Sequence, residues 1–268
     1  GEVITYGEVY ILLSPQLLFD FLRNIRIEIK EKLTSSAIAY PLYAWLLSHV
    51  SKETGDALHE QGLRPISQYV YREGEHIRWV VNLLNDEAAE LFGPILERES
   101  AALIHQGVIP FGEHRTETIE SAQCLLGRAR NMDDGNRFAL DMVTPTAFKQ
   151  SGRYAIFPQE SLMLQSLIAR WELCFPEFPL DDPDAMQAIL AGLHVVDYRL
   201  HTARYTMKQT KIPSFMGHVI LEGHLPVPLM EIVKTLYVFA PYAGMGIKTA
   251  LGMGGVQLCD TQKEDGKR

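Results

Sequence analysis

The chain has 268 residues, 47% of them hydrophobic, and a mean hydropathy of −0.03, which suits a globular protein of two domains. No apolar run approaches the roughly 18–20 residues of a membrane span, and the first residues lack the basic segment and apolar block of a signal peptide. Three scattered cysteines exclude a disulfide scaffold and a zinc finger. We therefore expect a cytoplasmic protein without membrane attachment.

The first half of the chain predicts the order strand, helix, strand, strand, helix, strand. Residues 24–29 alternate between polar and apolar side chains, as a half-buried strand does. Gly55 and Gly62 are expected to bracket a loop, and Gly74 a hairpin turn. The remaining predicted elements are a helix at 36–50, strands at 66–72 and 76–82, a helix that begins at Asp86, and closing strands at 101–108 and 116–125.

The second half repeats that order. Its predicted elements are a strand at 137–143, helices that begin at Pro158 and Asp181, strands at 195–207 and 215–221, a helix that begins at Pro228, and a strand at 255–258. Two β-α-β-β-α-β units in tandem predict an α+β protein of two ferredoxin-like (RRM-like) domains. We place the domains at 1–130 and 131–268, because residues 129–135 read as the boundary.

Charge is distributed unevenly along the chain. The net charge is −8, but 13 basic and 13 acidic side chains balance from residue 137 onward, so the first half carries the whole deficit. No acid lies between Asp197 and Glu222, a stretch that contains four basic residues, Arg199, Arg204, Lys208 and Lys211. Local potential decides phosphate binding more than total charge does. The tract therefore predicts either a phosphate-binding surface or an ordinary solvated strand face.

A glycine-rich segment at 243–256, AGMGIKTALGMGGV, holds five glycines in twelve residues from Gly244. Such a loop permits positive φ and close backbone approach, and Lys248 is expected to lie among exposed N–H groups that face a phosphate chain. It is not a Walker A loop, because Ile247 stands where that motif needs glycine and because the segment precedes a strand. The alternative is a loop that only lets the two domains pack.

This segment has the form GxGxKTxLGxGG between a helix and the last strand, and so resembles the signature of the RAMP superfamily of CRISPR-associated proteins. Residues 143–166 (VTPTAFKQSGRYAIFPQESLMLQS) and 208–217 (KQTKIPSFMG) are similar to the second domain of its repeat-processing endoribonuclease, the sixth Cas family. The resemblance implies tandem ferredoxin-like folds and cleavage of CRISPR precursor RNA within each repeat.

The resemblance also implies catalytic residues. The triplet Leu58-His59-Glu60 is similar to the family's catalytic histidine segment, which lies in a loop after the first helix. Tyr43, or else Tyr40, matches a helix tyrosine of some members. The lysine that some members carry after the histidine is missing here, and Arg64 is the nearest downstream cation. An arginine stays protonated, so Arg64 is expected only to stabilise charge. The alternative for both tyrosines is core packing.

The predicted RNA-binding residues are Lys149, Arg153, Arg199, Arg204, Tyr205, Lys208, Lys211, Gly244, Gly246 and Lys248, with Tyr205 as a stacking face. No group of histidines and acids has metal-ligand spacing, so neither a metal nor a cofactor is predicted. The expected partner is CRISPR repeat RNA, with effector-complex subunits and a second copy of the chain as further candidates. Two alternatives stay open: a non-catalytic RNA-binding RAMP subunit, and a protein-interaction module on the same fold.

Overall fold

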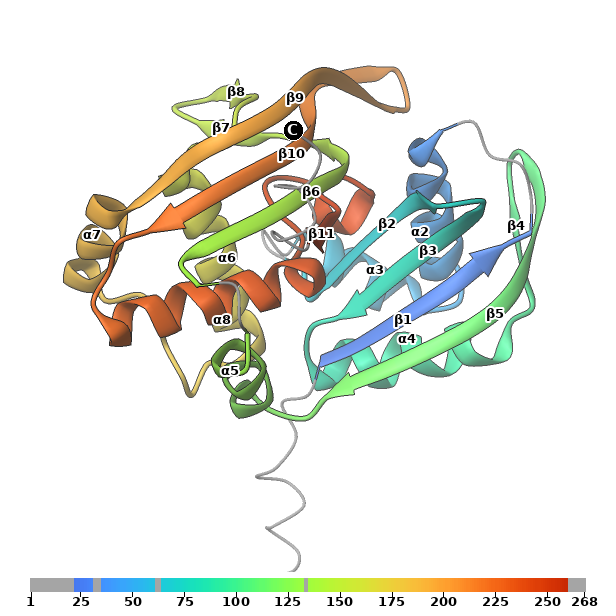
Figure 1. The fold of residues 1–268 in the computed structure, drawn as a ribbon. Coiled ribbons are helices and arrows are strands. Elements are labelled where there is room, and N and C mark those ends of the chain that lie inside the picture. The colour runs from blue at the N-terminus through green and yellow to red at the C-terminus, as the bar shows by residue number, and fades with distance from the viewer. Residues whose placement is uncertain (1–21, 31–34, 61–63, 133–134, 260–268) are drawn as a thin grey trace, which may run out of the picture.

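The computed structural model describes residues 22–30, 35–60, 64–132 and 135–259, with the side chain of His59 outside this description. Two antiparallel sheets form the molecule (Figure 1). The first has the strand order β2-β3-β1-β5-β4 and the second β11-β6-β10-β9. Numbered within each half, both contain the order fourth-first-third-second of a ferredoxin-like unit, with β4 added as a hairpin partner of β5. The predicted fold class is confirmed.

The first half contains strands β1 (Leu22–Ile29), β2 (Ile66–Glu73), β3 (His76–Leu83), β4 (Ala101–Ile104) and β5 (Gly107–Ile119). Its helices are the 3₁₀ turn η1 (Ser36–Ile38), α2 (Ala39–Leu47), α3 (Lys52–Glu60) and α4 (Asp86–Arg98). Asn85 caps α4, because its side chain accepts a 2.9 Å hydrogen bond from the N–H of Ala88. One apolar core joins α2 and α4 to the face of β1 and β3 that carries Ile27 and Trp79.

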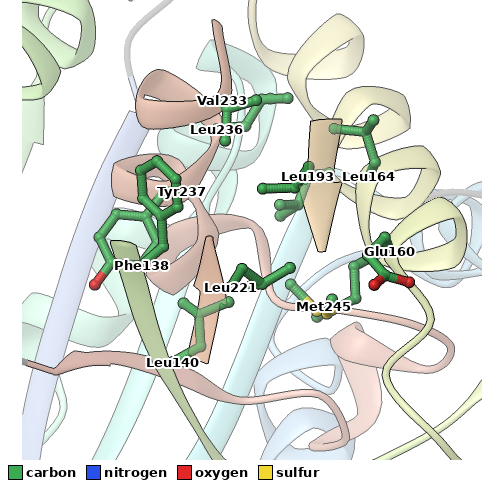
Figure 2. Close-up of a pocket in the computed structure, with 12 residues that line it drawn as sticks. Phe138, Leu140, Glu160, Leu164, Leu193, Leu221, Val233, Leu236, Tyr237 and Met245 are labelled. Atoms are coloured by element: carbon green, nitrogen blue, oxygen red, sulfur yellow. The ribbon is translucent and has the colours of Figure 1, made fainter. Parts of the chain in front are cut away.

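The second half contains strands β6 (Arg137–Thr146), β7 (Phe148–Gln150), β8 (Arg153–Ala155), β9 (Leu193–Met207), β10 (Thr210–Gly223) and β11 (Val256–Cys259). Its helices are α6 (Glu160–Cys174), α7 (Pro183–Gly192), α8 (Val227–Ala243) and the 3₁₀ turn η2 (Thr249–Leu251), and α5 (Ala122–Arg130), at the end of the first half, shares their core. Apolar side chains from β6, β9, β10, α6 and α8 converge in its core (Figure 2). The cavity left there measures about 40 Å³, so this interior is packed core and no ligand site.

Residues 116–125 are not a closing strand as predicted. β5 ends at Ile119, and α5 begins at Ala122 after the extended residue Ser121. The apolar residues Leu125 and Ala129 of α5 share a core with α8, which explains why a helix is preferred there. The β7–β8 hairpin was not predicted either, because its strands have three residues each. The domain division at residue 130 stays a prediction.

The two halves meet along the inner side of β2 and the glycine-rich segment. The amide of Gln68 donates to the carbonyl oxygens of Ala39 (2.9 Å) and Ala250 (3.1 Å). A Cβ on Gly255 would lie 2.6 Å from the ring of Tyr69, so only glycine fits between the halves here. No helix in the described part of the chain is both long and apolar enough to cross a membrane.

Candidate functional site

His59 lies on a helix and not in the predicted loop. α3 covers Lys52–Glu60, and the hydroxyl of Ser51 accepts a hydrogen bond from the N–H of Thr54 (3.2 Å) at its start. Gly55 is tolerated inside α3, although a helical glycine costs about 1 kcal/mol relative to alanine. Gly62, the second predicted bracket of the loop, lies outside the described residues. The histidine therefore sits near the C-terminal end of a short helix.

Arg64 connects the other two catalytic candidates. Its Nε donates a 3.1 Å hydrogen bond to the carbonyl oxygen of Leu58, the residue directly before His59. Its guanidinium lies 5.8 Å from the centre of the Tyr43 ring, within the range of a cation–π contact. The structure thus brings Arg64, Tyr43 and the backbone next to His59 together, although 16 positions separate His59 from Tyr43 in the sequence.

Tyr43 is a buried residue of α2. Its side chain is 2% exposed, and its hydroxyl has no hydrogen-bond partner among the described residues. Burial raises the pKa of Tyr43, and the positive charge of Arg64 offsets part of that rise. Tyr43 therefore keeps its proton at working pH. Its ring, more than its hydroxyl, is placed to act, because the ring faces the Arg64 guanidinium.

The predicted basic tract follows the β9–β10 hairpin. Arg199 and Arg204 are exposed on β9, and Lys211 is exposed on β10. Lys208 occupies the two-residue turn with φ 54°, so its side chain stands at the hairpin tip. The structure thus spreads this tract along one long hairpin.

Tyr205 cannot offer a stacking face in this structure. It is 1% exposed, and its hydroxyl donates a 2.5 Å hydrogen bond to the carbonyl of Leu251. Burial raises the pKa of Tyr205. Cross-strand pairing with Ile212 turns its ring into a small core beneath the glycine-rich segment. Its place is therefore structural.

The N–H groups of the glycine-rich segment are largely used inside the protein, and are not the exposed donors expected. Gly244 ends α8 at φ 68° and donates to Ala240, while Met245 and Gly254 donate to Gly254 and Pro145. The N–H of Gly246 donates to Ser166 Oγ (2.8 Å). Lys248, by contrast, is exposed with φ 55°. The segment therefore packs the halves together, and it also exposes the side chain of Lys248.

A polar cavity of about 430 Å³ opens beside this segment. It is lined by β7, α6 and residues 246–248, and it brings Lys149 and Lys248 to one place. Arg153 is exposed on the neighbouring strand β8. Gly246 belongs to the same wall. A Cβ at this position would collide with the carbonyl of Ala147.

Arg170 lies in the wall of the cavity and was missed by sequence reasoning. It is 5% exposed, and its guanidinium donates to Ser166 Oγ (2.9 Å), the Gly246 carbonyl (2.7 Å) and Thr249 Oγ1 (2.9 Å). Burial lowers its pKa to about 10, so it stays charged. Among the described residues it forms no ion pair with a carboxylate. The only sequence signal was a cation inside the apolar stripe of a helix.

One group of side chains in the described region could hold a metal ion, contrary to the sequence prediction. The donor atoms of Asp141, His218 and Cys259 lie within 4.8 Å of one another, and His218 Nδ1 is 2.7 Å from Asp141 Oδ1. These residues come from β6, β10 and β11, which are far apart in sequence but adjacent in the sheet. Sequence spacing therefore could not reveal the group. It belongs to the second sheet, whereas Tyr43, His59 and Arg64 belong to the first half.

The sequence is similar to that of known proteins. The family model for CRISPR-associated endoribonuclease Cas6 matches residues 140–256. CRISPR-associated endoribonuclease Cas6 of Streptococcus thermophilus is 29% identical over 223 residues, which cover 82% of this chain and 91% of that protein. The Cas6 of Mycobacterium tuberculosis is 25% identical over 226 residues, which cover 81% and 70%.

Solved structures share the fold. A Cas6 product complex superposes with a TM-score of 0.74 at 19% identity, over 90% of this chain and 100% of that chain. Thermus thermophilus Cas6 gives 0.64 at 24% identity, over 89% and 98%. These structures share the arrangement of two tandem ferredoxin-like units. The chain is similar in sequence and in fold to CRISPR-associated endoribonuclease Cas6.

Proposed function

We propose that this protein is a metal-independent endoribonuclease that binds CRISPR repeat RNA and cleaves the precursor within each repeat. The 2′-hydroxyl attacks the adjacent phosphorus, so a 2′-O–P bond forms and the P–O5′ bond breaks. The 2′-hydroxyl loses a proton and the leaving 5′-oxygen gains one. The products are a 2′,3′-cyclic phosphate and a 5′-hydroxyl, and the step consumes neither water nor metal.

His59 is the proposed proton-transfer group, because an imidazole with an ordinary pKa of about 6.5 can accept or donate a proton near neutral pH. Arg64 would stabilise the negative charge that develops on the phosphorane oxygens. Tyr43 would position Arg64 through its ring. The observation that carries the proposal is the double contact of Arg64, with the Leu58 carbonyl and with the Tyr43 ring, in a chain similar to this family. Labelled repeat RNA with mapped cleavage ends tests it.

Tyr43→Phe is expected to slow cleavage by no more than about tenfold, which is about 1.4 kcal/mol of activation free energy. The variant keeps the ring that faces Arg64 and loses only a buried hydroxyl without a described partner. The free energy of unfolding should stay equal or rise by about 1 kcal/mol, because an unsatisfied buried group is removed. Single-turnover rates and urea unfolding measure both quantities, with Tyr71→Phe, whose exposed hydroxyl lies outside the proposed site, as control. A loss as large as that of a proton-transfer group would contradict the positioning role.

The proposed RNA surface runs from the 430 Å³ cavity to the tip of the β9–β10 hairpin. Lys149, Lys248 and the buried charge of Arg170 make the cavity electropositive, which suits a backbone phosphate. The two exposed lysines of the tract, Lys208 and Lys211, extend that surface along the hairpin. The local charge outweighs the net charge of −8 at this surface.

The double variant Lys149→Ala/Lys248→Ala should bind repeat RNA more weakly. The slope of log affinity against log salt should fall by roughly one unit per lost phosphate contact. Filter binding across a salt series measures the slope. Lys30→Ala/Lys234→Ala changes the net charge equally at surfaces outside the cavity and is the control. If the two double variants behave alike, the lysines of the cavity do not contact RNA.

The alternative to this proposal is a non-catalytic RNA-binding role. Tight binding of repeat RNA by the wild type without cleavage would assign that role. Effector-complex subunits and a second copy of the chain remain proposed partners of either form.

A further inference from the structure

Three aromatic side chains are exposed beside the edge of the second sheet. Tyr154 on β8 is 46% exposed, Phe157 after β8 is 42% exposed, and Tyr198 on β9 is 53% exposed. The rings of Phe157 and Tyr198 meet edge to face, with centroids 5.4 Å apart and planes at 90°. We call these three residues the aromatic surface. The β7–β8 hairpin, which carries Tyr154, lies beside the edge strand β9, which carries Tyr198 (Figure 1).

The exposure of the aromatic surface is not explained by local packing. Neighbouring residues of the same segments, Ala155, Val195 and Leu200, turn inward and pack on the core. The three aromatic residues are not buried in this way. Ile156 and Val196, which are 38% and 47% exposed, add further apolar surface. Phe157 and Tyr198 are in direct ring contact, and exposed apolar side chains that lie together on a folded domain mark an interaction site more often than chance.

Positive charge accompanies the aromatic surface. Lys149 is the cross-strand partner of Tyr154, and Arg153 precedes it on β8. Both cations are exposed, and within the described residues neither forms an ion pair. Lysine is depleted from the cores of protein–protein interfaces, whereas alternating cations and aromatic rings are what single-stranded nucleic acid requires. Charge complementarity therefore favours RNA over a protein as the occupant.

We propose that the aromatic surface stacks unpaired bases of the repeat RNA while Lys149 and Arg153 hold the adjacent phosphates. This inference rests on the proposed RNA-binding function and extends it. Bases inside an A-form duplex are stacked on each other and shielded in a deep groove, so an exposed ring reaches only unpaired nucleotides. The substrate is thus a repeat with a single-stranded segment that passes the β7–β8 hairpin.

The test measures affinity of Phe157→Ala/Tyr198→Ala for a repeat that carries a 2′-deoxynucleotide at the cut and therefore stays intact. Loss of a stacked base should weaken binding by about 5- to 100-fold. The salt slope should stay that of the wild type, because stacking releases no counterions. Lys149→Ala should change the slope instead, and Tyr198→Phe should bind like the wild type. Both replaced rings are exposed, so circular dichroism and melting should be unchanged.

Abasic substitutions identify the contacted nucleotides. An abasic site at a stacked position should weaken binding to the wild type but not further to the double variant. Equal affinity of double variant and wild type would overturn the inference, even with cleavage intact. If the double variant also lost a self-association seen for the wild type by sedimentation, the aromatic surface would be a protein interface. If the proposed function is wrong, the wild type itself will not bind repeat RNA. That result differs from equal affinity of the double variant and the wild type.

Discussion

His59→Ala is expected to slow cleavage of repeat RNA by about 10²–10⁴-fold, the usual contribution of general acid–base catalysis. Affinity for the repeat should stay within a few fold, since the cavity and the β9–β10 hairpin do not include His59. Arg64 and the Leu58 carbonyl can keep their contact, because that bond uses the backbone. Single-turnover cleavage and filter binding on the same preparation separate the two quantities.

The matched control is His105→Ala, which removes an exposed imidazole from the β4–β5 turn of the same half. It should cleave at the wild-type rate. If His59→Ala lost affinity in proportion to rate, His59 would position the RNA and would not carry a proton. If cleavage survived in His59→Ala, the enzyme class would stand and another residue would be needed at the site.

Gly246→Val is expected to lower the free energy of unfolding by about 2–6 kcal/mol and to abolish RNA binding. Two causes add. The backbone has φ 83°, where a β-branched residue is strained, and a Cβ would collide with the carbonyl of Ala147. Displacement of Gly246 would also break the hydrogen bond from Arg170 to its carbonyl oxygen. The cavity wall would then be lost.

Gly74→Val isolates the first cause, because Gly74 has φ 62° in a hairpin turn with open space around it. That variant should lose only about 1–3 kcal/mol and should bind RNA normally. Urea unfolding of both variants gives the comparison. Equal destabilisation by the two substitutions would mean that the glycine-rich segment tolerates a side chain. The close approach of Gly246 to the Ala147 carbonyl would then not explain the need for glycine.

Much of the order of helices and strands along the chain could be predicted because local signals are strong. Residues 24–29 alternate, and the turn at Gly74 joins two strands whose register pairs Glu73 with His76. The region 116–125 misled because β5 continues into it as far as Ile119, and no glycine or proline marks the change to α5, which begins at Ala122. The segment forms the helix α5 because it packs against α8, which is distant in sequence.

The kinds of residue at the candidate site could be predicted from the sequence better than their geometry could. The candidate cations of β7, β8 and the glycine-rich segment could be named from the sequence, because a charged side chain is recognisable there without knowledge of the fold. The exposed tyrosine of β9 could not be predicted, because Tyr205 and Tyr198 lie on the same strand and only the pairing with β10 decides which ring is buried. Arg170 and the Asp141–His218–Cys259 group were missed because tertiary contacts create them.

The central claim is attack by the RNA's own 2′-hydroxyl, and one measurement tests it most directly. Wild-type protein is incubated in EDTA with two labelled repeats, one all-RNA and one with a single 2′-deoxynucleotide just before the mapped cut. We predict full cleavage of the first, ending in a 2′,3′-cyclic phosphate, and no cleavage of the second at that bond. Cleavage of the deoxy repeat, or loss of all cleavage in EDTA that Mg²⁺ or Zn²⁺ restores, would contradict the account.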